Sequence, residues 1–332
     1  MKVFIKSIST YLPEKVLTNE ELVKDFPEWS VEKVASKIGI SQRHVSNDNE
    51  TAVDMAVQAA ENLFAENDDI SRNDIDFVIL CTQSSDYKLP TSACLIQKRL
   101  GLGTNIGAFD YNLGCSGYVY GLSIAKGLVC GGIAKNVLLL TSETYTKYLH
   151  PKDKGNRTIF GDGASATIIS TEGIAEIGNF SLGTDGEGAE NLIVKSGGSR
   201  YPDNLNDLIF NENGNPVSSD YLFMNGSEIF NFTLEAVPKL VKDTLKKNLV
   251  EQSDINLFVF HQANKYIMNF MRRKINIDED KFYYCLENIG NTVSSTIPIA
   301  LYEANKENKL LGNVLLAGFG VGYSWGGVIL KF

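Results

Sequence analysis

Cys115 is the first residue of this chain whose surroundings could support chemistry. An extended apolar run, Ile106–Tyr111, ends just before it, and an apolar stretch with helical spacing begins just after it. A helix that starts there would place its unpaired backbone N–H groups and the positive end of its dipole beside the thiol. Both features favour the thiolate, the nucleophilic form of cysteine. Considered alone, a lone cysteine is more often a buried packing residue, so the rest of the chain must decide.

Three other segments place polar or glycine residues where catalytic loops usually lie. His261 ends a buried apolar run, Asn291 lies in a polar loop, and a glycine-dense turn spans Gly318–Gly327. Each has a structural interpretation: a satisfied histidine, a turn-forming asparagine and a tightly packed turn. The glycine-dense turn leads into a strand rather than a helix, which argues against a dinucleotide site.

Strand-like and helical stretches alternate along the chain, a pattern typical of βαβ units in a mostly parallel sheet covered by helices. The second half repeats the order of the first, and the glycine- and asparagine-rich stretch Gly183–Ser219 is expected to be a long loop. We therefore expect an α/β protein of two similar halves, 1–172 and 173–332. The expected elements include strands at Phe77–Cys81, Val137–Thr141, Leu257–Phe260 and Phe282–Leu286, and helices at Glu50–Glu66, Pro90–Leu100, Ser227–Asn248, Asn264–Lys274 and Thr296–Asn305.

Composition excludes several classes of function. The 332 residues carry a net charge of −9, which disfavours nucleic acid as a partner. The five cysteines are widely spaced and contain no CxxC pair, which argues against a zinc site or a disulfide framework and fits a reducing cytoplasm. The longest apolar region, Gly117–Leu140, is interrupted by Lys126 and Lys135 and is too broken for a membrane span. We expect a soluble cytoplasmic protein with no metal and no membrane partner.

Taken together, the four segments resemble a known family. The chain is similar to β-ketoacyl-acyl-carrier-protein synthase III, one of the thiolase-like condensing enzymes, from Tyr11 to Gly326. The resemblance implies a five-layered αβαβα fold, two pseudo-symmetric halves and a homodimer. The motifs that carry it are Gly39-Ile40-Ser41-Gln42-Arg43-His44, Gly114-Cys115-Ser116, Phe160-Gly161-Asp162-Gly163-Ala164, His261-Gln262-Ala263-Asn264 and Gly290-Asn291-Thr292.

The resemblance also implies a reaction and a role for each site residue. Cys115 would accept an acyl primer, and loss of CO2 from a malonyl unit on acyl carrier protein would generate the attacking enolate. His261 Nε2 and the Asn291 amide would donate hydrogen bonds to the malonyl thioester oxygen. The backbone N–H groups of Cys115 and Val321 would form the oxyanion hole, although glycine is common at the position of Val321. No bound cofactor is implied, since acyl-CoA or acyl-carrier protein and malonyl-carrier protein are substrates.

The substrate-binding positions depart from the family pattern. The predicted coenzyme A contacts are Trp29, which stands earlier than usual, Lys154 in place of an arginine, and Arg157 nearby. Leu89 replaces a phenylalanine at the acyl-pocket position that the partner subunit supplies, which favours a longer or branched primer. The helix predicted to dock acyl carrier protein contributes Asn264, Lys265, Arg273 and Lys274, and Tyr266 replaces a usual arginine.

Two other functions fit the same residues. An enzyme of this fold could transfer the Cys115-bound acyl group to an oxygen or nitrogen nucleophile, as relatives in secondary metabolism and sugar modification do. The second alternative is a non-catalytic acyl-binding subunit, and the presence of all three catalytic residue types argues against it.

Overall fold

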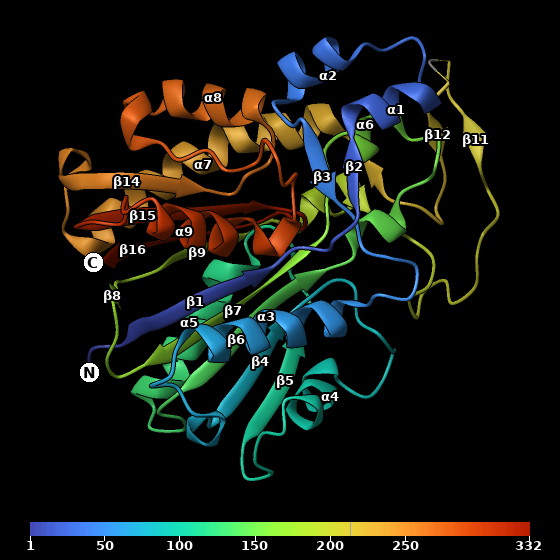
Figure 1. The fold of residues 1–332 in the computed structure, drawn as a ribbon. Helices are drawn as coiled ribbons and strands as arrows, with labels where there is room; N and C mark the ends of the chain where they lie inside the picture. The colour runs from blue at the N-terminus through green and yellow to red at the C-terminus, as the bar shows by residue number, and fades with distance from the viewer. Residues whose placement is uncertain (213) are drawn as a thin grey trace.

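The computed structural model describes residues 1–212 and 214–332, and its main strands form one mixed sheet of ten strands. The order is β14-β15-β16-β8-β1-β7-β6-β4-β5, and β9 pairs with β16 (Figure 1). Strand β8 pairs with β1 on one side and with β16 on the other, so it links the two groups of strands. The strands span Phe4–Tyr11 (β1), Phe77–Cys81 (β4), Gly107–Tyr111 (β5), Val137–Glu143 (β6), Gly163–Ser170 (β7), Ala175–Ile177 (β8), Ser181–Thr184 (β9), Ile255–Phe260 (β14), Asn313–Gly320 (β15) and Ser324–Lys331 (β16).

The helices divide the molecule into five layers, as expected. Helices α3 and α4 pack on the outer side of the first group of strands, and α7 packs on β15 and β16 and carries α8 beside it (Figure 1). Helices α5 and α9 lie between the two groups, because each contacts strands of both. The helices span Ala52–Glu66 (α3), Ser92–Arg99 (α4), Gly117–Cys130 (α5), Gly226–Asn248 (α7), Lys265–Lys274 (α8) and Thr296–Lys306 (α9).

The smaller elements lie around the loops that connect these layers. The paired strands β2 and β3 and the helices α1 and α2 form one unit, and α6 lies across from it. Their bounds are Val16–Thr18 (β2), Gln42–His44 (β3), Leu192–Ile193 (β10), Ile209–Phe210 (β11), Pro216–Val217 (β12), Phe223–Met224 (β13), Asn19–Asp25 (α1), Val31–Ile38 (α2) and Lys154–Arg157 (α6). Short 3-10 helices span Arg72–Asp74, Tyr145–Tyr148, Gly186–Asn191, Gln252–Asp254, Glu279–Lys281 and Val293–Ser295.

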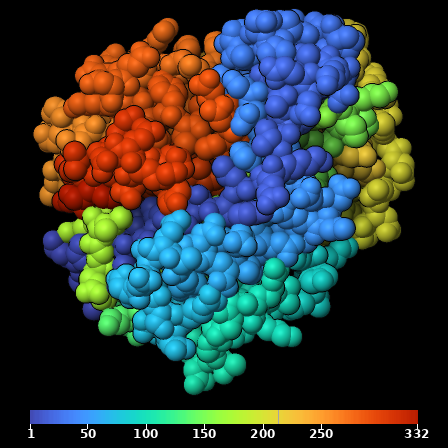
Figure 2. All heavy atoms as spheres, viewed as in Figure 1, coloured from blue at the N-terminus to red at the C-terminus, as the bar shows by residue number. Residues whose placement is uncertain are grey.

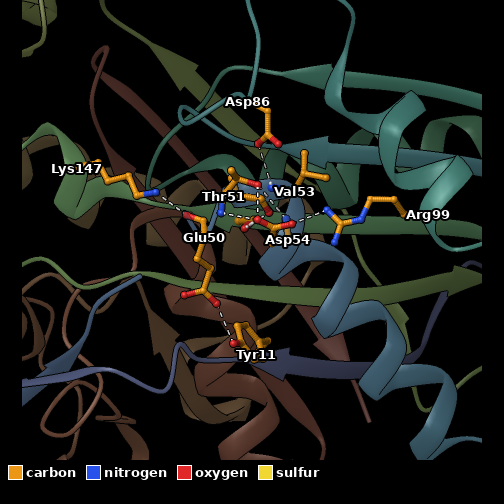
Figure 3. Close-up of polar contacts among 10 residues, drawn as sticks. Tyr11, Glu50, Thr51, Val53, Asp54, Asp86, Arg99 and Lys147 are labelled. Atoms are coloured by element: carbon orange, nitrogen blue, oxygen red, sulfur yellow. Dashed lines mark hydrogen bonds and ion pairs between the residues drawn. The ribbon is translucent and has the colours of Figure 1, made fainter. Parts of the chain in front are cut away.

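The start of α3 anchors the long loop that follows β4. Thr51 and Asp54 cap each other's backbone N–H groups, which ends the loop and begins the helix. Asp86, on the loop after β4, accepts a hydrogen bond from Val53 N at 3.3 Å, and Arg99 of α4 pairs with Asp54 at 2.6 Å (Figure 3). The loop that carries Leu89 is therefore held to α3, and α3 is in turn paired with α4.

Most predicted elements are confirmed, and three predictions are wrong. The sheet is not mostly parallel, because six of its nine strand pairings in the described chain are antiparallel. Phe282–Leu286 is not a strand: only an isolated bridge joins Phe282 to Phe258, because the Gln262 side chain takes the backbone N–H of Cys285 at 2.7 Å. Gly183–Ser219 is not simply a loop, since it contains β10, β11 and β12. The division into 1–172 and 173–332 stays a prediction. Among the described residues, no helix is long and apolar enough to cross a membrane.

Gly127 offers a test of the central helix α5. Among the described residues, a Cβ built on Gly127 meets no atom within 4 Å, whereas a Cβ on Gly121 would lie 2.4 Å from Tyr111 Oη. We predict that Gly127→Ala raises the free energy of unfolding by about 0.5–1 kcal/mol, because alanine loses less conformational entropy in a helix. Gly121→Ala should lower it. Denaturant unfolding of both variants measures this, and a loss of stability in Gly127→Ala would contradict the described environment of α5.

Candidate active site

Cys115 lies between the two groups of strands, two residues before the first residue of α5. Its side chain is buried, with 6% of its surface exposed. Strand β15 passes so close that a Cβ on Gly320 would lie 2.8 Å from Cys115 Sγ, and one on Gly318 would lie 2.8 Å from the Cys115 carbonyl oxygen. Only glycine permits this approach, so the glycine-dense segment exists to bring β15 against the cysteine.

The turn after β15 is tied to the residues beside the cysteine. Ser116 Oγ and Ser324 Oγ share a hydrogen bond of 2.7 Å, and Ser324 Oγ donates to Val321 O at 2.9 Å. The backbone N–H groups of Cys115 and Val321 both approach the thiol and act to lower its pKa. Backbone N–H groups beside a reacting atom are the kind of donor that an oxyanion hole uses.

The pKa of Cys115 nevertheless differs from the sequence-based expectation. Burial and the nearby Glu143 carboxyl raise the pKa of the thiol to about 12, despite the two backbone N–H groups. The free energy lost when a thiolate is removed from water exceeds the stabilisation that the two backbone N–H groups give it. Cys115 is therefore a neutral thiol before substrate arrives.

His261 follows the last residue of β14 and is also buried. Its backbone N–H donates to Ala317 O at 2.8 Å, which fixes it to the neighbouring strand β15. Its Nδ1 lies 2.7 Å from Thr296 Oγ1, and its ring packs edge-on against Phe319. Burial lowers the pKa of His261 to about 3, so the imidazole is neutral.

Asn291 is held at both backbone groups. Its N–H donates to Ile159 O at 2.9 Å, and its carbonyl accepts from Gly161 N at 3.0 Å. Its side-chain Oδ1 accepts the Val293 N–H at 2.9 Å. The amide nitrogen Nδ2 donates one of its two hydrogens to Ala263 O at 3.4 Å, which leaves its second N–H to donate.

Cys115, His261 and Asn291 line one cavity of about 290 Å³. Its other walls are mainly apolar and include Phe160, Leu192, Met224, Ile229, Phe230 and Phe319. An apolar cavity with three converging polar side chains is suited to an acyl chain with a reactive carbonyl at one end. Leu192 and Met224 come from the paired strands β10 and β13, for which the sequence carried no recognisable signal.

Leu89 does not line this cavity in the described chain. Its side chain is 82% exposed, on the loop between β4 and α4. The structure therefore separates Leu89 from its own Cys115, and any role in an acyl pocket requires a second subunit.

The predicted coenzyme A contacts lie where α6 meets the α1–α2 connection. Lys154 forms an ion pair with Glu28, next to Trp29. Arg157 pairs with Asp25 at 3.0 Å and lies over the Phe26 ring. The structure brings these predicted residues into one region, with both cations already paired to carboxylates.

The predicted carrier-protein contacts lie on α8. Asn264 caps this helix, accepting the Ile267 N–H at 2.9 Å, and also lines the cavity. Lys265 and Arg273 line a groove of about 750 Å³ between α2 and α8, where the blue and orange segments of Figure 2 meet. Lys274 is exposed at the end of the helix. The Phe230 ring packs against the tilted Tyr266 ring and edge-on against Phe270, so an aromatic cluster lies between the groove and the cavity.

Glu143 is a site residue that sequence reasoning missed. It is fully buried and accepts hydrogen bonds from Gln83 N at 3.0 Å, Ser84 Oγ at 3.0 Å and Ser294 Oγ at 2.9 Å. Burial raises its pKa to about 8. Glu143 thus joins the loop after β4 to the segment that follows Asn291. In the described chain, no group of three or more His, Cys, Asp or Glu side chains is placed to hold a metal ion.

The fold and the site define a thiolase-like condensing acyltransferase. Family models described as 3-oxoacyl-[acyl-carrier-protein (ACP)] synthase III match residues 109–186 and, for the C-terminal part, 245–332. The chain belongs to the 3-oxoacyl-[acyl-carrier-protein] synthase III family. It is 36% identical to beta-ketoacyl-[acyl-carrier-protein] synthase III of Clostridium perfringens, covering 97% of this chain and 96% of that protein.

Solved structures agree with this assignment. A crystal structure of a 3-oxoacyl-(acyl-carrier-protein) synthase III superimposes with a TM-score of 0.97 at 48% identity over 100% of both chains. The synthase III of Pseudomonas aeruginosa superimposes with a TM-score of 0.87 at 28% identity, covering 100% of this chain and 98% of that one. These relatives favour condensation over acyl transfer to oxygen or nitrogen.

The raised pKa of Cys115 predicts how the thiol reacts with an alkylating agent. Because the folded pKa is about 12, the thiolate fraction should increase steadily with pH, and the rate of Cys115 alkylation by iodoacetamide should rise about tenfold per pH unit from pH 7 to 9.5. Mass spectrometry of the modified peptide measures this rate, with Cys115→Ser as the control for other thiols. A plateau below pH 8 would show instead that the helix start has produced a thiolate.

Proposed function

We propose that this chain condenses an acyl primer, held as a thioester on Cys115, with malonyl-acyl carrier protein. The single observation that carries the proposal is that Cys115, His261 and Asn291 line one apolar cavity. The condensing acyltransferase class follows from family membership, and the roles of the individual residues are the proposal.

In the first half-reaction, the acyl group of the primer moves from the thiol of its carrier to the thiol of Cys115. The exchange is between thioesters of similar stability, so it needs little driving force. The oxyanion of the tetrahedral intermediate would lie against the N–H groups of Cys115 and Val321. In support of this role, Ser324 Oγ donates to Val321 O and accepts from Ser116 Oγ, so the turn that carries the Val321 N–H is tied to the residue after Cys115.

In the second half-reaction, the malonyl unit loses CO2 and its thioester oxygen becomes an enolate oxygen. Asn291 Nδ2 and His261 Nε2 would donate to that oxygen. Removal of water from the cavity strengthens these hydrogen bonds as the charge develops. The enolate carbon then attacks the acyl carbonyl on Cys115, and the sulfur departs.

The identity of the primer is inferred from its surroundings. The apolar walls of the cavity favour an acyl chain longer than acetyl, and Leu89 from a second subunit would narrow the pocket less than phenylalanine does. Lys154 and Arg157 would have to release Glu28 and Asp25 before they could bind the phosphates of coenzyme A. We therefore infer that acetyl-CoA is a weakly held primer and that a longer acyl-CoA or an acyl-carrier protein is preferred.

We propose acyl carrier protein as the partner that docks on α8, where Lys265, Arg273 and Lys274 provide local positive charge on an acidic chain. A homodimer is proposed because Leu89 is exposed on a loop anchored by Asp86.

A cytoplasmic location fits the five free cysteines.

The condensation itself is tested by release of labelled CO2 from malonyl-acyl carrier protein in the presence of a primer. Cys115→Ala should lower formation of the 3-oxoacyl product by roughly 10³-fold or more, because no acyl-enzyme forms. Asn291→Ala should lower it by about 10²–10³-fold, the effect of removing one preorganised donor. Cys94→Ala, a half-buried cysteine outside the cavity, is the matched control. Acyl transfer to a hydroxyl or amine without CO2 release would contradict condensation.

Primer preference is tested by intact-protein mass spectrometry of Cys115 after incubation with acetyl, butyryl and octanoyl donors. We expect the longer donors to acylate Cys115 faster than acetyl. Leu89→Phe should shift the preference back towards acetyl, since a larger side chain shortens the partner's pocket, whereas Tyr87→Phe on the same exposed loop should not. A wide preference for acetyl in the native protein would refute the inferred primer.

A further inference from the structure

The Thr296 hydroxyl, at the first residue of α9, lies against two hydrogen-bonding partners at the floor of the site. Its Oγ1 is 2.7 Å from His261 Nδ1 and 3.0 Å from the Val293 carbonyl oxygen. Thr296 is 3% exposed, so water does not replace either partner. The motifs of the sequence did not draw attention to this residue.

The chemistry of these three groups fixes the direction of both hydrogen bonds. A carbonyl oxygen only accepts, and a hydroxyl has one hydrogen to give. If that hydrogen pointed to His261, two oxygens 3.0 Å apart would face each other in a buried place without a hydrogen between them. The arrangement that satisfies every group has Thr296 donating to Val293 O and accepting from His261 Nδ1–H.

We propose that Thr296 is a positioning residue that keeps the proton of neutral His261 on Nδ1, so that Nε2 presents a lone pair to Cys115. This proposal rests on the proposed function and adds a step to its first half. Nδ1 is occupied by Thr296, which leaves Nε2 as the ring nitrogen on the cavity side.

Such a base meets a need that the structure creates. Cys115 is buried as a neutral thiol, and a neutral thiol is a poor nucleophile. No other side chain that lines the cavity in the described chain is a neutral base: the walls are aliphatic or aromatic apart from Thr233, Asn264, Tyr266 and Asn291. His261 is therefore the group placed to accept the thiol proton during acyl transfer.

The protons balance over both half-reactions. Cys115 gives its proton to Nε2 as its sulfur forms the bond to the acyl carbon, and the primer's departing thiolate takes a proton from solvent. The imidazolium then carries Nδ1–H towards Thr296 and Nε2–H towards the malonyl thioester oxygen, where the malonyl carboxylate offsets its charge. When the new carbon–carbon bond forms and the Cys115 sulfur departs, the Nε2 proton returns to it. His261 Nε2 thus accepts a proton in the first half-reaction and donates it in the second, while Nδ1–H stays hydrogen-bonded to Thr296 throughout.

The first experiment observes the tautomer directly. The chain has only three histidines, so 15N-histidine NMR of the substrate-free protein is simple, and His44→Gln and His150→Gln remove the other two signals. We expect His261 to show a protonated Nδ1 and a bare Nε2 at pH 7. A protonated Nε2 with a bare Nδ1 would overturn the proposal, whatever the behaviour of any variant.

The second experiment compares Thr296→Val, which keeps the shape and loses the hydroxyl, with Thr296→Ser, which keeps the hydroxyl. Single-turnover acylation of Cys115 by butyryl-CoA should slow at least tenfold in Thr296→Val with KM little changed, and stay within threefold of native in Thr296→Ser. Acylation at the native rate by folded Thr296→Val would refute the proposal. If the native protein itself does not acylate, the proposed function fails instead, and the NMR measurement still decides the tautomer.

Discussion

The close approach of strand β15 to Cys115 is the contact on which the rest of the site depends. Gly318 and Gly320 allow the backbone of one group of strands to touch the start of a helix that follows the other group. A Cβ at either position would lie 2.8 Å from an atom of Cys115, so the two backbones would have to move apart, and the N–H groups of Cys115 and Val321 would move apart with them. The two glycines thus convert a packing contact between layers into a chemical site.

The burial that follows from this packing sets the charges of the site. Burial raises the pKa of Cys115 and of Glu143 and lowers that of His261, so all three groups favour their neutral forms. A buried site whose groups are neutral weakens the nucleophile before substrate binds. It strengthens every hydrogen bond to the charge that appears during decarboxylation, and that charge is the harder problem of the reaction. The pocket therefore favours the enolate over the resting thiolate.

Much of the site was predictable because its residues lie at the ends of regular elements. Cys115 precedes a helix, His261 follows a buried strand and Asn291 follows a glycine, and each location has a local sequence signal. The acyl cavity was not predictable in the same way, since Leu192 and Met224 come from two-residue strands that only tertiary pairing creates. Phe282–Leu286 has a strand-like sequence, yet a side chain, Gln262, satisfies the backbone that a strand partner would have used. The pKa of Cys115 was misjudged because helix position is visible in a sequence and depth of burial is not.

The backbone conformation of Val293 is a further feature of the site that its local sequence does not predict. This β-branched residue adopts φ +56°, a left-handed conformation that costs on the order of 1–3 kcal/mol. In that conformation its N–H meets Asn291 Oδ1 and its carbonyl meets Thr296 Oγ1, which in turn holds His261. One strained peptide thereby orients the amide of one catalytic candidate and the ring of another, although the two come from different elements. The folded structure tolerates the strain because Val293 is buried in the apolar cluster that includes Cys115, so the hydrophobic packing that buries the thiol also holds its two partners in position.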